Sequence, residues 1–431
     1  MNHEARKLLL NLYTTALKAV HGKSVVKKHL TQHPIKNPVA VIAIGKAAMA
    51  MAQGAYAVLG HQLMMGLVIT KSAHGNHSRQ SWPFTVVESS HPYPDEHSIY
   101  AGQQLIQFIE AIPESVTEVI LLISGGTSSL VEYLPQNISV NAINEINHYL
   151  LASGYFIEII NRIRKRVSLI KAGRLAHYLS HKKTTVLMIS DVPGDDIKVI
   201  GSGLTVPHDD SDIELGDILL PANLSELVKQ APPPLLKANN DKLIEHVIIA
   251  NNRLARVNVI EKLQKLTIPC FDSKNELEGN VMDNARMIVE TVRSGKDGIY
   301  LWGGETTVNL PENSGKGGRC QALALAAAIE LSQDDNIVLL ACGSDGTDGP
   351  GEDAGAMVDK QTIERGIEEQ LNPQTALQQA DSGTFLDASG DLIHTGPTGT
   401  NVMDLVLVVK GSDQLVKQWV SQIHTHHRSE S

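Results

Sequence analysis

The sequence predicts an α/β protein with two domains, and three observations support this. Short apolar runs end in loops rich in Gly, Ser and Asp, and helical stretches follow them. The runs are apolar throughout rather than alternating, which suits strands of parallel sheets covered by helices on both faces. The chain has 431 residues, whereas one domain usually has about 150. We therefore expect a Rossmann-like N-terminal parallel-sheet domain, a C-terminal α/β domain and a cleft between them.

The N-terminal half follows this alternation in order. The first 20 residues, MNHEARKLLLNLYTTALKAV, have the apolar spacing of an amphipathic helix. The run VAVIAIG (39–45) predicts a strand, and KAAMAMAQGAYAVL predicts the helix after it. Two further strands are predicted by VILLISGG (119–126) and TTVLMIS (184–190), each ending in a polar loop. Ligands of such folds bind beyond the carboxyl ends of the strands, so these loops hold the candidate site residues.

The C-terminal half repeats the theme with HVIIANN, GIYLWGGE, NIVLLACGSDGTDG and DLVLVV. Between the halves, the segment 221–241 contains three consecutive prolines, which cannot continue a helix and favour an extended connection. We therefore expect the domains to be residues 1–235 and 236–431.

Composition excludes several classes of function. The formal net charge of −10 argues against a general nucleic-acid-binding protein, which would carry a basic face. The three cysteines are widely spaced and form neither a disulfide framework nor a zinc pattern, which fits a reducing compartment. No apolar run approaches the length of a membrane span, and the polar N-terminus does not resemble a signal peptide. We expect a cytoplasmic protein without nucleic-acid or membrane partners.

A lysine and a glycine-rich stretch are the first candidate ligand groups. Lys46 directly follows a predicted strand, where it could reach an anion at the start of the next helix, although an ordinary exposed lysine would look the same. Gly125 and Gly126 in ISGGTSSL permit a ligand to approach the backbone closely. The hydroxyls of the next three residues favour phosphate or carboxylate binding over hydrolysis, because the G-x-S-x-G pattern of a serine nucleophile is missing. These hydroxyl residues are Thr127, Ser128 and Ser129. A tight turn with a helix cap is the structural alternative.

Carboxylates at the ends of predicted strands are the second group of candidates. Asp191 follows the strand at 184–190, and Glu305 and Asp345 follow two strands of the C-terminal half. Such carboxylates suit Mg²⁺ ligation or activation of a hydroxyl, although aspartates also form turns. Glycine loops, strand-end acids and a few cations together favour phosphoryl transfer. A dehydrogenase is disfavoured because the complete G-x-G-x-x-G fingerprint is missing, and a protein that only binds its ligand is the other alternative.

A set of motifs taken jointly resembles one family. In chain order they are GKAAMAMA, SHPYPDEHS, LLISGGTSSL, INRIRKRVSLIKAGRLA, SDVPGDDIKVIGSG, GGETTV, GKGGR, SDGTDGPGEDAGA and TGPTGTNVMDL. They resemble the glycerate 2-kinases that join an N-terminal glycerate kinase domain to a C-terminal MOFRL domain. The resemblance covers nearly the whole chain. It implies that the protein uses ATP and Mg²⁺ to phosphorylate the 2-hydroxyl of D-glycerate, giving 2-phosphoglycerate and ADP.

The resemblance also implies roles for individual residues. Lys46 and Arg319 correspond to the active-site cations, Asp191 to a base or metal ligand, and Asp345 to a metal ligand. The glycine-rich stretch and Glu305 would hold either the ATP phosphates or the glycerate carboxylate. Further polar groups of the cleft would come from the TGPTGTNVMD loop, namely Thr398, Asn401 and Asp404. Two alternative functions stay open: a hydroxypyruvate reductase, and a non-catalytic protein that binds a hydroxy acid or a nucleotide. Whether the protein forms a homodimer also stays open.

Four positions depart from the usual pattern of that family. Cys320 and Ala322 stand where the family usually has Asn and Glu, directly after Arg319. Leu204 replaces a proline and Ala172 replaces a glycine. Losing the Asn and Glu side chains could weaken the support of Arg319 or alter substrate choice.

Overall fold

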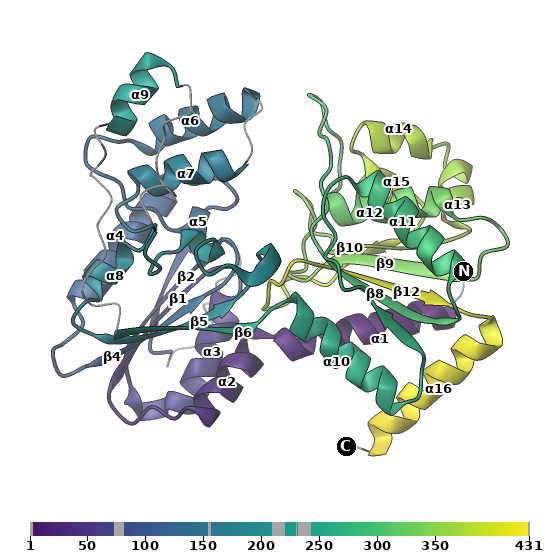
Figure 1. The fold of residues 1–431 in the computed structure, drawn as a ribbon, viewed down its shortest axis with the longest axis horizontal. Coiled ribbons are helices and arrows are strands. Elements are labelled where there is room, and N and C mark those ends of the chain that lie inside the picture. The colour runs from purple at the N-terminus through teal and green to yellow at the C-terminus, as the bar shows by residue number, and fades with distance from the viewer. Residues whose placement is uncertain are drawn as a thin grey trace. The chain divides into compact units, whose positions relative to one another are not determined.

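The computed structural model describes residues 3–72, 82–153, 157–208, 220–229, 231 and 243–429. The chain divides into two compact units (Figure 1). We call residues 22–249 the N-terminal unit, and residues 1–21 together with 250–431 the C-terminal unit. Each unit is built around one six-stranded sheet, which confirms the α/β class.

The sheet of the N-terminal unit has the strand order β3-β2-β1-β4-β5-β6. The pairings of β1 with β2 and β4, of β2 with β3 and of β4 with β5 are all parallel, as the sequence predicted. The strands are β1 (Val39–Ile44), β2 (Leu63–Lys71), β3 (Phe84–Ser89), β4 (Glu118–Ile123), β5 (Lys183–Ile189) and β6 (Ile244–Ala250). All six residues of the central strand β1 are buried, because helices cover both of its faces.

Helices on both faces of this sheet supply the cover that its apolar strands require. Helix α3 contacts β1, β2 and β4, and α4 contacts β2 and β3. The helices are α2 (Gly22–Gln32), α3 (Ala48–Leu59), α4 (Glu96–Glu110), α5 (Thr127–Leu130), α6 (Val140–Ala152), α7 (Ile157–Val167), α8 (Leu175–Tyr178) and α9 (Ala222–Lys229). Helix α4 begins at a capping box formed by Asp95 and Ser98. Helices α6, α7 and α9 share a second, smaller apolar cluster.

The sheet of the C-terminal unit is mixed, with the order β11-β10-β9-β12-β8-β7. Strand β12 is antiparallel to both β8 and β9, whereas β7 is parallel to β8. The strands are β7 (Cys270–Asp272), β8 (Gly298–Gly304), β9 (Ile337–Gly343), β10 (Gly355–Asp359), β11 (Leu392–Ile393) and β12 (Asp404–Lys410). Every residue of β8 and β9 is buried although their partner β12 runs antiparallel, because helices lie on both faces here as well.

The helices of this unit are α1 (His3–Val20), α10 (Asn252–Lys265), α11 (Val281–Ser294), α12 (Arg319–Glu330), α13 (Thr362–Glu368), α14 (Pro373–Gln378), α15 (Ser382–Ala388) and α16 (Asp413–Ser429). Helix α12 is rich in alanine and leucine and packs with α11 in the largest part of the apolar core. Helix α1 confirms the amphipathic helix expected at the N-terminus.

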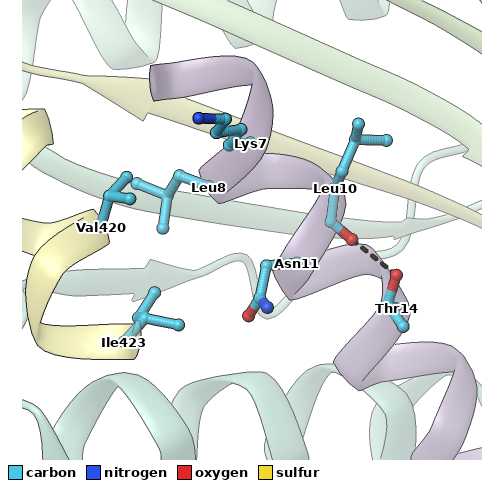
Figure 2. A pocket seen from close by; sticks show the side chains of 7 residues that line it. All are labelled: Lys7, Leu8, Leu10, Asn11, Thr14, Val420 and Ile423. Atoms are coloured by element: carbon cyan, nitrogen blue, oxygen red, sulfur yellow. Dashed lines mark hydrogen bonds between the residues drawn. The ribbon is translucent and has the colours of Figure 1, made fainter. Parts of the chain in front are cut away.

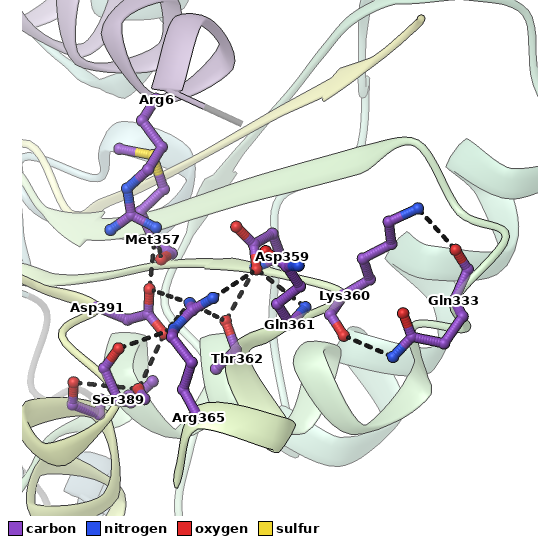
Figure 3. Close-up of polar contacts among 11 residues, drawn as sticks. Arg6, Gln333, Met357, Asp359, Lys360, Gln361, Thr362, Arg365, Ser389 and Asp391 are labelled. Atoms are coloured by element: carbon purple, nitrogen blue, oxygen red, sulfur yellow. Dashed lines mark hydrogen bonds and ion pairs between the residues drawn. The ribbon is translucent and has the colours of Figure 1, made fainter. Parts of the chain in front are cut away.

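Helix α1 belongs to the C-terminal unit, although the sequence suggested that residues 1–235 form one domain. Arg6 donates to the carbonyl of Met357 and to the carboxylate of Asp391, both at 2.9 Å (Figure 3). The hydroxyl of Tyr13 donates to the carbonyl of Gly343 at 2.6 Å. The compact N-terminal unit therefore begins at residue 22, after α1, and ends at residue 249. Most of the proline-containing segment expected at the boundary lies outside the described residues.

We expect Asp391→Ala to lower the free energy of unfolding by about 3 kcal/mol. The carboxylate of Asp391 is fully buried and accepts from Arg6, from Ser389 at 2.8 Å and from Arg365 at 2.7 and 2.8 Å. Its removal leaves two partly buried guanidinium groups without their shared counter-charge. Denaturant titration tests this, with the exposed Asp387→Ala as the matched control. Equal stability of the two variants would contradict the assignment.

Among the described residues, no helix is both long enough and apolar enough to span a membrane.

Candidate functional site

The glycine loop (residues 125–129) follows β4 and lies against two side chains from other segments. Gly126 has a left-handed backbone, with φ of 85°. A Cβ atom at this position would lie 2.9 Å from Cδ2 of His91 and 3.3 Å from Cγ of Lys46. Gly126 is therefore required both for its backbone angle and for the space that His91 and Lys46 occupy. The structure brings Lys46 to the glycine loop, so two groups that the sequence singled out separately lie together.

The hydroxyls of the glycine loop bond to the protein itself. Thr127 donates to the carbonyls of Ile44 at 3.0 Å and Ser124 at 2.7 Å, and Ser129 donates to the carbonyl of Gly126 at 3.1 Å. The hydroxyls of Ser128 and Ser202 are 2.7 Å apart. The sequence offered two roles for these hydroxyls, ligand binding and helix capping. In this structure they bond to the protein and stabilise the conformation of the loop.

The backbone amides of the loop are better placed to receive an anion than its hydroxyls. Within the described part of the chain, the amides of Gly125 and Gly126 donate to no protein acceptor. The carbonyl of Gly125 accepts from the amide of Lys46 at 2.9 Å, which fixes the loop against the residue after β1. Unpaired amides beside a lysine form a concave donor site of the kind that binds phosphate or carboxylate.

The strand order gathers the other candidates of the N-terminal unit at one sheet edge. Strands β1, β4 and β5 are adjacent and parallel, so Lys46, Gly125 and Asp191 each follow the carboxyl end of a neighbouring strand. Lys46 and Asp191 are both half-buried. His91 lies against the glycine loop, and reasoning from residue types did not name it as a candidate. The signal for it was its place in SHPYPDEHS, one of the motifs that carried the resemblance.

In the C-terminal unit, Arg319 is the first residue of α12 and is held by two carboxylates. Its Nε and Nη2 atoms lie 2.5 and 3.0 Å from the two oxygens of Asp404. Nη2 also lies 2.7 Å from Oε1 of Glu305. The register pairs Asp404 with Gly304 and Gly343, which places the ends of β8 and β9 and the start of β12 together. Glu305 and Arg319 therefore meet, as part of a triad with Asp404.

Two carboxylates around one guanidinium make Arg319 a fixed donor rather than a free cation. Burial alone would lower the pKa of Arg319, but Asp404 and Glu305 outweigh this and raise that pKa above its usual range. An arginine has five N–H groups, and three of them point to these carboxylates. Within the described residues, Nη1 makes no hydrogen bond to protein, and the side chain is 38% exposed. Nη1 is thus the part of Arg319 that can meet a ligand.

Asp345 and Thr398 fasten the two loops at this end of the sheet. The carboxylate of Asp345 accepts from the amide and hydroxyl of Thr347 at 3.0 and 3.1 Å. Thr398 donates its amide to the carbonyl of Asp345 at 3.3 Å and its hydroxyl to the carbonyl of Ser344 at 2.5 Å. Asn401, three residues after Thr398, is also buried. Both interpretations of this loop, as a structural loop and as a ligand contact, stay open, but the hydroxyl of Thr398 is already engaged.

The two carboxylates that the sequence predicted as metal ligands can be compared with what Mg²⁺ requires. The described residues contain no group of three or more His, Cys, Asp or Glu side chains that could hold a metal. Mg²⁺ does not need such a cage, because it usually binds one or two protein carboxylates together with phosphate oxygens and water. Asp191 and Asp345, the two predicted metal ligands, each offer one carboxylate in a different unit.

Asp348 is a buried carboxylate that supports α12. It accepts from the amides of Cys320 at 3.1 Å and Gln321 at 2.8 Å, in the first turn of the helix. The N-cap residue Gly318 has no side chain to do this, and a Cβ there would collide with Asp348. Asp348 therefore replaces the missing cap and fixes the helix end that carries Arg319.

The ionisation of Asp348 predicts a pH dependence of stability. Burial, followed by the negative charge of Asp404, raises the pKa of Asp348 to about 7. The folded protein keeps this proton between about pH 4 and pH 7, whereas the unfolded chain has released it. Stability from this group is therefore complete below pH 4 and is lost as the pH rises through 7, by roughly 4 kcal/mol.

Because Asn carries no titratable proton, Asp348→Asn should remove this dependence. The measurement is the free energy of unfolding of both proteins at several pH values, and their difference isolates Asp348 from other carboxylates. A difference that stays constant from pH 4 to pH 7 would show that Asp348 keeps an ordinary pKa.

The two residues of α12 that differ from the family pattern, Cys320 and Ala322, lie in the apolar core of the C-terminal unit. Burial raises the pKa of the Cys320 thiol, so it is uncharged beside Arg319. Arg319 takes its support from Glu305 and Asp404 instead of from these two positions.

Ala172 is a strained residue, and we expect Ala172→Gly to stabilise the protein by about 1 kcal/mol. Its φ of 54° lies in the left-handed region, which costs an alanine more than a glycine. Its amide donates to the carbonyl of Ser202 at 3.1 Å, a bond that glycine would keep. The melting temperature checks this, with Ala176→Gly, in helix α8, as the control that should destabilise. A lower melting temperature for Ala172→Gly would contradict the strain.

Two cavities lie away from these groups, along α1. One, of about 440 Å³, lies between α1 and α16 and is lined by Lys7, Leu8, Leu10, Asn11, Thr14, Val420 and Ile423 (Figure 2). The other, of about 390 Å³, lies between α1 and α10. The first has no acid or base other than Lys7, and neither contains a glycine loop. Neither cavity is lined by any of the predicted site residues, so the strand-end groups remain the candidate site.

Comparisons with known proteins find similar domains and similar whole chains. A domain of unknown function, DUF4147, matches residues 8–235, and the MOFRL family matches residues 298–404. The chain is 33% identical to a D-glycerate 2-kinase of Thermotoga maritima, over 93% of this chain and 97% of that protein. It is 30% identical to a putative hydroxypyruvate reductase of Agrobacterium vitis, over 94% and 95% of the two chains. A crystal structure of glycerate kinase from Thermotoga maritima superposes with a TM-score of 0.81 at 32% identity, covering 94% of this chain and 99% of that one.

Proposed function

Because this chain belongs to the glycerate kinase family, in which a DUF4147 domain precedes a MOFRL domain, we propose that it is a D-glycerate 2-kinase. In the proposed reaction, the terminal phosphoryl group of ATP passes to the 2-hydroxyl of D-glycerate, giving 2-phosphoglycerate and ADP. The observation that supports this most strongly is the glycine loop, with two unpaired amides beside Lys46. Phosphoryl transfer depends on positioned donors of this kind rather than on a covalent nucleophile.

The residues divide the work as follows in this proposal. The amides of Gly125 and Gly126, with Lys46, bind an anionic group of the substrates, either the ATP phosphates or the glycerate carboxylate. Asp191 accepts the proton of the 2-hydroxyl or binds the metal. Arg319 directs its Nη1 toward the charge that develops on the transferred group, while Asp404 and Glu305 hold the guanidinium still. When bound, Mg²⁺ would neutralise phosphate charge, and we propose that either Asp191 of the N-terminal unit or Asp345 of the C-terminal unit supplies a carboxylate to it.

The experiment that tests the function is an assay of the purified protein with Mg-ATP. We expect ADP to form only when D-glycerate is present. The relative named as a hydroxypyruvate reductase supplies the second candidate function. Oxidation of NADH by hydroxypyruvate without ATP would establish that function and exclude the kinase. Calorimetric binding of hydroxy acids or nucleotides without any product would instead indicate a protein that only binds its ligands.

A further inference from the structure

A buried ion pair lies behind the glycine loop, and the proposed reaction gives it no role. Lys171 donates to Oε2 of Glu132, and Ser168 donates to Oε1 of the same carboxylate at 2.6 Å. The two charged side chains are 0% and 2% exposed. Burying such a pair costs as much desolvation energy as its attraction returns, so stability alone is a weak reason for its presence.

The pair closes a ring of contacts around the glycine loop. Glu132 follows α5, the short helix that begins in the loop. On the other side of the pair, Lys171 precedes Ala172, whose amide donates to the carbonyl of Ser202. The hydroxyl of Ser202 lies 2.7 Å from that of Ser128, which returns the ring to the glycine loop. The ring therefore joins three segments of the N-terminal unit that are far apart in sequence.

Arginine side chains strengthen the same ring. Nη2 of Arg164 donates to the carbonyl of Ser128 at 2.8 Å, and Nη1 of Arg174 donates to the carbonyl of Ser168 at 2.7 Å. Glu132 is the carboxylate that attracts both arginines and Lys171. Burial lowers the pKa of Lys171 to about 8, and the charge of Glu132 opposes this shift. Glu132 thus bonds directly to Lys171 and attracts two arginines that are bonded to nearby carbonyl groups.

We propose that Glu132 and Lys171 are positioning residues, which hold the glycine loop in the shape that binds the anionic group of a substrate. The inference rests on the proposed kinase function for its effect on catalysis. Its effect on the loop itself does not depend on that function. An apolar pair of similar volume would fill the same space but could not bond to Ser168 or hold the two arginines.

The kinetic test compares a paired variant with conservative single variants. We expect the double variant Glu132→Leu with Lys171→Met to fold, and to raise the KM of the substrate that the loop binds at least tenfold. The KM of the other substrate should change less than twofold. Lys171→Arg keeps the charge pair and should retain at least one third of the wild-type kcat/KM. Glu132→Gln supplies a milder break if the double variant does not fold. Glu118, half-buried and paired with the exposed Lys183, provides the control Glu118→Gln, which should leave both KM values unchanged.

The closing experiment measures hydrogen exchange of the peptide covering residues 122–131 by mass spectrometry. We expect its amides to exchange at least tenfold faster in the double variant or in Glu132→Gln, while the peptide covering β9 stays unchanged. Unaltered exchange in residues 122–131 of a folded variant would overturn the proposal. This readout is separate from catalysis. If the wild type failed to phosphorylate glycerate but the exchange rose as stated, the kinase function would be wrong and the positioning role would stand.

Discussion

Arg319→Ala is expected to lower kcat with D-glycerate and Mg-ATP about a thousandfold, since cationic stabilisation of a transferring phosphoryl group has about this value. The structure holds the guanidinium in one orientation through Asp404 and Glu305. Removing it takes away the donor Nη1 and leaves Asp404 and Glu305 without their shared counter-charge, where our proposal puts the transferred group. Both consequences act on the transition state, so kcat should fall more than KM rises.

Arg319→Lys is the informative companion variant. A lysine carries the same charge but cannot bond to two carboxylates in a plane and still present a further donor. We expect it to recover less than a tenth of the wild-type kcat. Arg293→Ala is the matched control, because Arg293 also pairs with a carboxylate, Asp335 at 2.7 Å, on the surface of the same unit. Wild-type turnover in both Arg319 variants would remove this residue from the site.

Lys46→Ala is expected to lower kcat/KM by two to three orders of magnitude, the usual effect of losing one donor to developing negative charge. The Lys46 side chain packs along Gly126, so its loss removes a lysine that the structure places against the glycine loop. Lys46→Met keeps most of the packing and separates the loss of charge from the loss of volume. We expect both variants to be equally impaired.

The exposed Lys183→Ala serves as the control for Lys46, because Lys183 begins β5 at the opposite end of the sheet. Melting temperatures of all variants show whether the fold is kept. If Lys46→Met retained wild-type kcat/KM, the lysine would be an ordinary surface residue, which was the alternative interpretation of the sequence.

The sequence predicted β1, β4 and β5 of the N-terminal sheet because each is a local apolar run. It did not predict β2 or β3, and it assigned the run of β6 to the C-terminal half, whereas β6 joins the N-terminal sheet. The same rule could not give strand direction in the C-terminal sheet. Residues of β8, β9 and β12 are buried on both faces because helices cover both, whichever way the strands run. Direction depends on how the connections pass over the sheet, and no local pattern records that.

The packing of α1 is a second feature that local patterns could not supply. The apolar spacing of α1 showed which face is buried but not which unit it contacts. Arg6 meets Asp391, and Tyr13 meets Gly343, across more than 300 residues of sequence. Only a long-range contact could reveal that the first helix belongs to the second unit.

The sequence indicated which residues are candidates for the site, but it did not indicate which hydrogen bonds they make. Lys46, the glycine loop and Arg319 were found from motifs, and the structure gives each a defined neighbourhood. Residue types could not show that the hydroxyl of Thr127 is used by backbone carbonyls, because that depends on the turn geometry. They also could not show that Asp348 caps α12 from a separate loop. We therefore propose the backbone amides of Gly125 and Gly126, rather than the hydroxyls of the glycine loop, as the groups that donate to a ligand.

The identity of the phosphorylated product tests the central claim most directly. The purified protein is incubated with Mg-ATP and D-glycerate, and the product is identified by phosphorus NMR against authentic 2-phosphoglycerate and 3-phosphoglycerate. The account predicts 2-phosphoglycerate, formed in equal amount with ADP and lost in Arg319→Ala and Lys46→Met. Formation of 3-phosphoglycerate, or no phosphorylated acid from a correctly folded protein, would contradict it.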